Sequence, residues 1–136
     1  MCSEVRGRCR TPLCLDSGRP RLRYGSTTLE QQTELKVGVL ALQGDFAEHN
    51  ALLTKLGAVG REVRLPKHLE GLEGLIIPGG ESTTLSRLMS LYHLREPIEG
   101  MARQGKVIWG TCAGLIMMAQ EITEGDPVPL GLMDIG

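Results

Sequence analysis

The chain has 136 residues, 41% of them hydrophobic, and a formal net charge of −1, which suffices for one compact core and no more. Its charge is balanced, with no basic stripe interleaved with aromatic residues, so nucleic acid is not an expected partner. No run of about 18 apolar residues occurs, which argues against a membrane span.

Residues 1–35 differ in character from the rest of the chain. Arginines stand there among Gly, Pro, Ser and Thr without a hydrophobic period, which is typical of a disordered N-terminal arm. Two alternatives are open: an over-extended gene start, with the true beginning near Leu35, and a weak organelle transit peptide. The arm holds Cys2, Cys9 and Cys14, whose spacing suits neither a zinc site nor a disulfide framework, so we expect no metal, reduced thiols and a cytoplasmic location.

From residue 36 onward, apolar strands alternate with helices, which predicts an α/β domain over residues 36–136. Near-continuous apolar strands joined by helices indicate a parallel sheet with helices on both faces. The expected strands are 36–42, 59–65, 73–77 and 106–109, and the expected helices are 45–57, 82–91, 96–104 and 113–121. Residues 130–135 read as the start of a further strand, which predicts an exposed sheet edge and an uncovered apolar face.

Candidate site residues follow three of these strands. Gln43 comes after the first strand, residues 79–82 after the third, and Cys112 after the fourth. Ligands bind at the carboxyl ends of the strands in such sheets. We therefore expect the three segments to meet at one rim.

Cys112 stands in a pattern typical of a nucleophile elbow, in which the chain turns sharply from a strand into a helix. The nucleophile adopts a strained conformation there, so its neighbours must be small, as Gly110 and Gly114 are. A thiol at a helix N-terminus is also biased towards the thiolate. The alternative interpretation of Cys112 is a small buried hydrophobic residue.

A second motif, PGGESTT at residues 78–84, follows the third strand. Adjacent glycines let a backbone N–H approach developing negative charge, and with the N–H of Ala113 this turn would form an oxyanion hole. The alternative is an ordinary strand-to-helix turn with a capping Ser82.

Three segments together are similar to the glutaminase subunit of pyridoxal 5′-phosphate synthase, a class I (triad) glutamine amidotransferase. They are VLALQGD at 39–45, PGGESTT at 78–84 and GTCAGL at 110–115, in matching order and spacing. The resemblance covers roughly residues 36–135. It implies a flavodoxin-like class I amidotransferase fold, incomplete at the C-terminus, and hydrolysis of L-glutamine without a cofactor. It also implies delivery of the ammonia to a synthase subunit within a hetero-oligomer.

Carried over by residue, the resemblance implies that Cys112 is the nucleophile that forms a glutamyl thioester. Gly80, Glu81 and Ser82 match the segment that binds glutamine, where Glu81 would attract the substrate ammonium and Ser82 its carboxylate. Gly79, Gly80 and Ala113 match the oxyanion-hole backbone. Gln43 is either an accessory residue near the oxyanion or a simple turn residue.

The family's base and its orienting carboxylate come from a His-x-Glu segment downstream of the cysteine, and no His-x-Glu segment follows Cys112 in this sequence. His49, in the first turns of the first helix, is the least implausible substitute, whereas His68 and His93 read as solvated or locally capped surface residues. We therefore expect this chain alone to have little glutaminase activity. A catalytically inactive module that docks on the synthase or binds glutamine is the alternative.

Overall fold

The computed structural model describes residues 34–123 and 127–135, which belong to one compact unit, Thr33–Gly136. The predicted disordered arm, with Cys2, Cys9 and Cys14, falls on residues that lie outside this description, apart from its last two positions.

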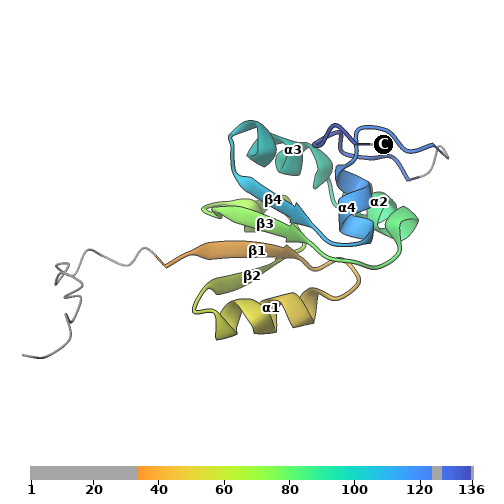
Figure 1. Ribbon diagram of the computed structural model, residues 1–136. Helices are drawn as coiled ribbons and strands as arrows, with labels where there is room; N and C mark the ends of the chain where they lie inside the picture. The colour runs from red at the N-terminus through yellow and green to blue at the C-terminus, as the bar shows by residue number, and fades with distance from the viewer. Residues whose placement is uncertain (1–33, 124–126, 136) are drawn as a thin grey trace, which may run out of the picture. The chain divides into compact units, whose positions relative to one another are not determined.

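A parallel sheet of four strands forms the centre of the unit, in the order β2-β1-β3-β4 (Figure 1). The strands are β1 (Lys36–Leu40), β2 (Val59–Val63), β3 (Gly74–Ile77) and β4 (Val107–Gly110). Val39 pairs with Glu62 on one side and Ile76 on the other, and Ile77 pairs with Gly110. The predicted parallel α/β fold is confirmed.

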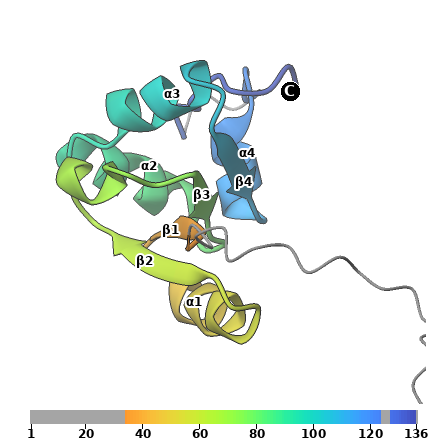
Figure 2. The same cartoon turned by 90° about the vertical axis from the view of Figure 1, so that its left-hand side faces the viewer.

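Helices lie on both faces of the sheet, as predicted. α1 (Phe46–Lys55) lies on one face, and α2 (Ser82–Leu91) and α3 (Arg95–Arg103) lie on the other (Figures 1 and 2). α4 (Ala113–Met118) contacts α2 and β4. Right-handed crossovers explain the division, because the chain moves from β1 to β2 towards one edge and from β3 to β4 towards the other.

The main core lies between the sheet and helices α2, α3 and α4. Its fully buried members include Leu40, Ile77, Leu85, Met89, Ile98 and Met117. The opposite face is thinner, because α1 has no fully buried residue. On β4, Val107 is 70% exposed and Trp109 is 54% exposed.

Three helices end in the same hydrogen-bonded arrangement, in which the first residue after the C-cap has a positive φ. These residues are Gly57 after α1, His93 after α2 and Gly105 after α3, with φ of 78°, 55° and 76°. After α2, the N–H of His93 is donated to the carbonyl of Ser90 and the N–H of Leu94 to that of Met89. His93 is thus an exposed helix terminator, which confirms its interpretation as a surface residue.

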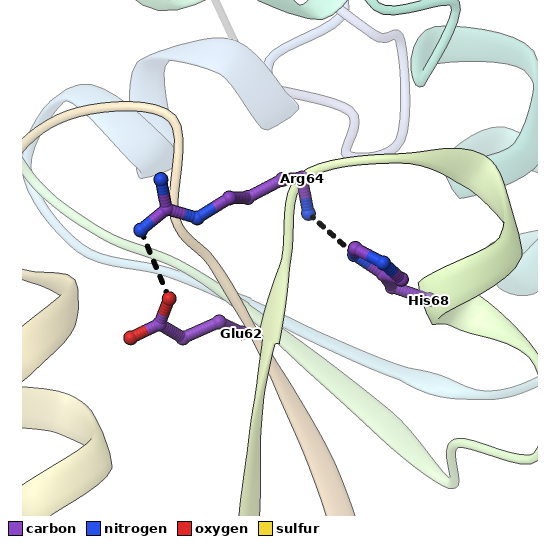
Figure 3. Close-up of polar contacts among 3 residues, drawn as sticks. All are labelled: Glu62, Arg64 and His68. Atoms are coloured by element: carbon purple, nitrogen blue, oxygen red, sulfur yellow. Dashed lines mark hydrogen bonds and ion pairs between the residues drawn. The ribbon is translucent and has the colours of Figure 1, made fainter.

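Most predicted element bounds agree with the structure within two residues, but the end of β2 needs explanation. β2 stops at Val63 rather than residue 65, because the N–H of Arg64 turns to the Nδ1 atom of His68 at 3.2 Å (Figure 3). His68 lies in a 3₁₀ helix, η1 (Pro66–Leu69), and its local role was predicted. The Arg64 guanidinium also pairs with Glu62 at 2.9 Å (Figure 3).

The prediction was wrong after Cys112: the helix ends at Met118 rather than 121, and residues 130–135 form no strand of the sheet. The carbonyls at the end of α4 accept hydrogen bonds from this segment instead, Met117 from Leu130 and Met118 from Leu132. Only an isolated bridge, Ala119 to Met133, has strand-like pairing there.

Arg95 holds the approach to that segment. Its guanidinium donates to the carbonyl oxygen of Val128 at 3.0 Å and to that of Pro129. Ser86, a buried polar residue of α2, donates its hydroxyl to the same Val128 oxygen at 3.2 Å. These tertiary bonds fix the segment against α2 and α3, and a periodicity argument cannot anticipate them.

Candidate active site

Cys112 occupies a sharp turn between β4 and α4. Its backbone has φ 49° and ψ −114°, a conformation that side-chain-bearing residues rarely adopt and that costs on the order of 1–3 kcal/mol. Backbone bonds on either side hold the turn: the N–H of Thr111 is donated to Ile77 at 3.1 Å, and the N–H of Leu115 to Cys112 at 2.9 Å. The thiol side chain is exposed, so the interpretation of Cys112 as a buried hydrophobic residue is wrong.

Gly110 and Gly114 flank this turn because there is no room for side chains. A Cβ on Gly114 would overlap the carbonyl oxygen of Ile77, and one on Gly110 would overlap the backbone of Gly114. The prediction that the neighbours of Cys112 must be small is therefore confirmed, because larger residues would overlap the backbone.

The glycine turn after β3 lies against Cys112. A Cβ placed on Gly79 would stand 3.3 Å from the Cβ of Cys112, and Gly80 has φ 147°, which favours glycine. The loop after β1 completes the cluster, because a Cβ on Gly44 would overlap the carbonyl oxygen of Gly79. The structure thus brings together the three segments that the sequence placed at one rim.

Gln43 packs directly on the glycine turn. Its side-chain amide occupies the space that a Cβ on Gly80 would need, and its Oε1 accepts the N–H of Glu81 at 3.2 Å. The Nε2 atom is buried and has no hydrogen-bond partner among the described residues. An unsatisfied donor beside a candidate oxyanion hole favours the accessory role over that of a simple turn residue.

Glu81 is the N-cap of α2, which corrects the alternative of a capping Ser82. Its carboxylate accepts the N–H groups of Thr83 at 2.9 Å and Thr84 at 2.5 Å, while Ser82 is the first helical residue. The pKa of Glu81 falls to about 2, because the Thr84 hydroxyl and then the Thr84 and Thr83 backbone N–H groups hydrogen-bond the charged form. The result is an exposed, firmly ionised carboxylate beside the glycine turn.

Ala113 is the first residue of α4 and is buried. The N–H groups of Gly114 and Leu115 are already donated, to Thr111 and Cys112. Helix geometry provides no partner for the first N–H, so that of Ala113 is the donor of this turn left for a ligand.

The structure places His49 beside the elbow, which is defined here as residues 110–114. Its Nε2 atom lies 3.5 Å from the Oγ1 atom of Thr111, and its ring meets that of Trp109 edge-on with centroids 6.2 Å apart. The sequence placed His49 at the same rim but did not identify Thr111 or Trp109 as its partners. The position of Thr111 directly before Cys112 was the one feature of the sequence that could have pointed to it as a partner of His49.

Within residues 34–123 and 127–135, no group of three or more His, Cys, Asp or Glu side chains is arranged to hold a metal ion. No helix in that part of the chain is long and apolar enough to cross a bilayer.

A family profile described as the SNO glutamine amidotransferase family matches residues 39–136. The chain belongs to this family. Membership agrees with the strand, glycine turn and cysteine elbow described above, and it confirms the resemblance drawn from the three sequence segments.

Curated relatives include subunits of pyridoxal 5′-phosphate synthase, named PdxT. The chain is 54% identical to that of Roseiflexus castenholzii over 103 residues, which cover 74% of this chain and 54% of the relative. It is 54% identical to that of Dehalococcoides mccartyi over 104 residues, which cover 74% and 53%. The chain therefore spans about half the length of these curated relatives.

Solved structures agree on the fold. A crystal structure of a glutamine amidotransferase superposes with a TM-score of 0.66 at 47% identity, covering 70% of this chain and 51% of that one. A Listeria monocytogenes protein described as a peptidase E superposes with a TM-score of 0.63 at 15% identity, over 76% and 66% of the two chains, and shows the fold alone.

Proposed function

We propose that this chain carries the nucleophile and glutamine-binding part of a glutaminase that hydrolyses L-glutamine to glutamate and ammonia. The observation that carries the proposal is the exposed Cys112, held at a positive φ directly against the turn at residues 79–80. A scaffold that keeps a cysteine strained and accessible beside closely approaching backbone suits attack on a carbonyl carbon.

In the proposed reaction, the Cys112 thiolate attacks the side-chain amide carbon of glutamine and the carbonyl oxygen becomes an oxyanion. Gly79, Gly80 and Ala113 are the candidate donors to that oxyanion, and one such donor is typically worth about 2.7 to 4 kcal/mol in the transition state. The carbon–nitrogen bond then breaks, the nitrogen takes a proton and ammonia leaves. Water attacks the thioester, glutamate departs and the thiolate is regenerated.

Substrate recognition is assigned to Gly80, Glu81 and Ser82. The ionised, exposed carboxylate of Glu81 offers a negative charge for the substrate ammonium, even though both of its oxygens also cap α2. Ser82, half-buried in the first turn of α2, is the candidate donor to the substrate carboxylate. Gln43, with its free Nε2 donor against Gly80, is an accessory candidate for the oxyanion.

Proton transfer requires a base, which in the family comes from a histidine downstream of the cysteine. The 136 residues hold no histidine after Cys112, because all three histidines precede it, and no His-x-Glu segment follows it. His68 bonds the Arg64 backbone and His93 terminates α2. We therefore propose that hydrolysis depends on a histidine and a carboxylate from outside these 136 residues, and that the chain alone binds glutamine or docks without turnover.

The expected partner is a pyridoxal 5′-phosphate synthase subunit, which would receive the ammonia in a cytoplasmic hetero-oligomer. The proposal rests on the relatives, which are subunits of that synthase.

An electrophilic glutamine analogue such as 6-diazo-5-oxo-L-norleucine tests the nucleophile. Trypsin releases residues 107–136 as one peptide in which Cys112 is the sole cysteine, so mass spectrometry reads the site directly. We expect glutamine-protected labelling of Cys112 and none in Cys112→Ser. Absence of both labelling and glutamine binding would contradict the proposal.

Ammonia release separates the two candidate functions. With the synthase subunit present, we expect release by the 136-residue chain to match that of a Cys112→Ala control, because loss of one triad member commonly costs about four to six orders of magnitude. Release well above that control would show that the chain contains its own base.

A further inference from the structure

We infer that His49 and Thr111 form a positioning pair that fixes the orientation of the Cys112 elbow from the α1 side of the sheet. The inference rests on the proposed role of Cys112 as nucleophile. It assigns His49 to positioning rather than to proton transfer.

The elbow needs restraint beyond its own backbone bonds. A non-glycine residue at φ 49° persists only where the surroundings over-determine its conformation. The backbone N–H of Thr111 is donated to Ile77 and its carbonyl oxygen accepts from Gly114, so its hydroxyl is the group left to contact a further element. That hydroxyl lies 3.5 Å from the Nε2 atom of His49.

His49 comes from an element that otherwise serves the other half of the sheet. α1 packs mainly against β1 and β2, and none of its residues is fully buried. The contact with Thr111 therefore links this helix to the end of β4, which is separated from β2 by two strands and from β1 by β3 in the sheet order β2-β1-β3-β4. A link that spans the sheet restrains the elbow relative to the loop after β1, where Gln43 lies.

Trp109 restrains the ring that makes this link. Trp109 precedes Thr111 by two residues, so the two side chains leave the extended chain on the same side. The edge-on contact at 6.2 Å gives the imidazole a preferred plane, with Nε2 directed at the hydroxyl. His49 therefore makes two distinct contacts, a ring contact with Trp109 and a nitrogen contact with Thr111. Substitutions can remove either contact and leave the other.

The test uses the full 136-residue chain and variants that remove one atom pair at a time. His49→Phe keeps a ring against Trp109 but removes the nitrogen, and Thr111→Val keeps the shape but removes the hydroxyl. His49→Gln and Thr111→Ser restore a polar atom at each position. His68→Phe is the matched control, because it removes a histidine hydrogen bond at the β2 edge of the sheet.

The readout is the rate constant for alkylation of Cys112 by iodoacetamide, measured on the 107–136 peptide, with a melting curve for every variant. We expect His49→Phe and Thr111→Val each to slow alkylation by about three- to tenfold, the equivalent of one hydrogen bond. The double variant should be no slower than the slower single variant. His49→Gln, Thr111→Ser and His68→Phe should stay within about twofold of the parent chain.

Unchanged rates in both single variants, or single effects that multiply in the double variant, would overturn the pair. If His49→Phe fails to fold, the comparison of Thr111→Ser with Thr111→Val decides the question in the same way. Iodoacetamide does not depend on glutamine, so the pair and the glutaminase proposal fail separately. Equal labelling of all variants by the glutamine analogue and by iodoacetamide overturns the pair alone.

Discussion

Glu81 combines a structural role, the capping of α2, with a proposed role in substrate binding. Its carboxylate caps α2 through two backbone N–H groups and stays exposed next to the glycine turn. The cap was not predicted, because Ser, Thr, Asp and Asn are the usual capping residues and Ser82 follows directly. The turn at residues 79–80 places residue 81, rather than residue 82, directly before the helix. The side chain of Glu81 is therefore the one that accepts the N–H groups of the first helical turn.

The capping role predicts a pH dependence of stability. The folded-state pKa of Glu81, about 2, lies below the ordinary value of 4.5. The stabilisation that the ionised carboxylate gives is therefore complete above the unfolded pKa and is lost as the pH falls from 4.5 to 2. We expect Glu81→Gln to lower the urea midpoint at pH 6, and the difference from the parent chain to shrink over that interval.

Glu73→Gln is the control for this measurement, because Glu73 is exposed and its side chain makes no hydrogen bond or ion pair within the described residues. Urea unfolding followed by circular dichroism at several pH values gives both curves. A Glu81→Gln difference that stays constant from pH 6 to pH 2 would contradict the capping role.

The part of the candidate site that could be predicted from the sequence is the convergence of three segments at one rim of the sheet. Cys112, the turn at residues 79–80 and Gln43 each follow a parallel strand, so their convergence followed from the fold class. The contact of His49 with Thr111 did not follow, because it depends on the rotamer of a helical side chain and on the exact height of α1 over the sheet.

At the scale of secondary structure, some helix ends could be predicted from the sequence and others could not. The first helix was predicted to end at residue 57, and Gly57 follows the C-cap of α1 with φ 78°. The end of α4 was misplaced, because carbonyls that would continue the helix bond residues 130 and 132 instead. Local glycine signals are visible in a sequence, whereas competition from a distant segment is not.

His93 occupies a position that the other two helix ends give to glycine. A side-chain-bearing residue in the left-handed region pays a steric cost of about 1–2 kcal/mol. We expect His93→Gly to raise the free energy of unfolding by about 1 kcal/mol, since the flanking Met89 and Leu94 are already fully buried. Chemical denaturation of the parent and variant chains measures the difference.

Gly105→Ala is the matched reciprocal change, because it introduces a Cβ at the equivalent position with nothing within 4 Å of it. The destabilisation therefore comes from the backbone conformation, and we expect the free energy of unfolding to fall by about 1 kcal/mol. A His93→Gly chain that is no more stable than the parent would show that the histidine side chain makes a compensating interaction.

At the scale of the whole unit, the architecture was the most predictable property. Four apolar runs separated by helical segments allow few arrangements once crossovers must be right-handed. The sequence did not predict that α1 covers its face of the sheet less fully than α2, α3 and α4 cover the other. This difference depends on how far α1 extends over the sheet. The face of β4 that carries Val107 and Trp109 is left largely open.

The exposed face and edge of β4 predict self-association of the 136-residue chain. Within the described residues β4 pairs with β3 alone, so its outer backbone groups and its apolar side chains Val107 and Trp109 are available together. We expect sedimentation velocity to show association that rises with concentration, with a blue shift in the fluorescence of Trp109, the single tryptophan. Val107→Lys should reduce the association, because a charge on an edge strand opposes strand pairing. Leu91→Lys, at a residue 67% exposed on α2, should not, and equal effects of the two lysines would assign the association to general hydrophobicity rather than to β4.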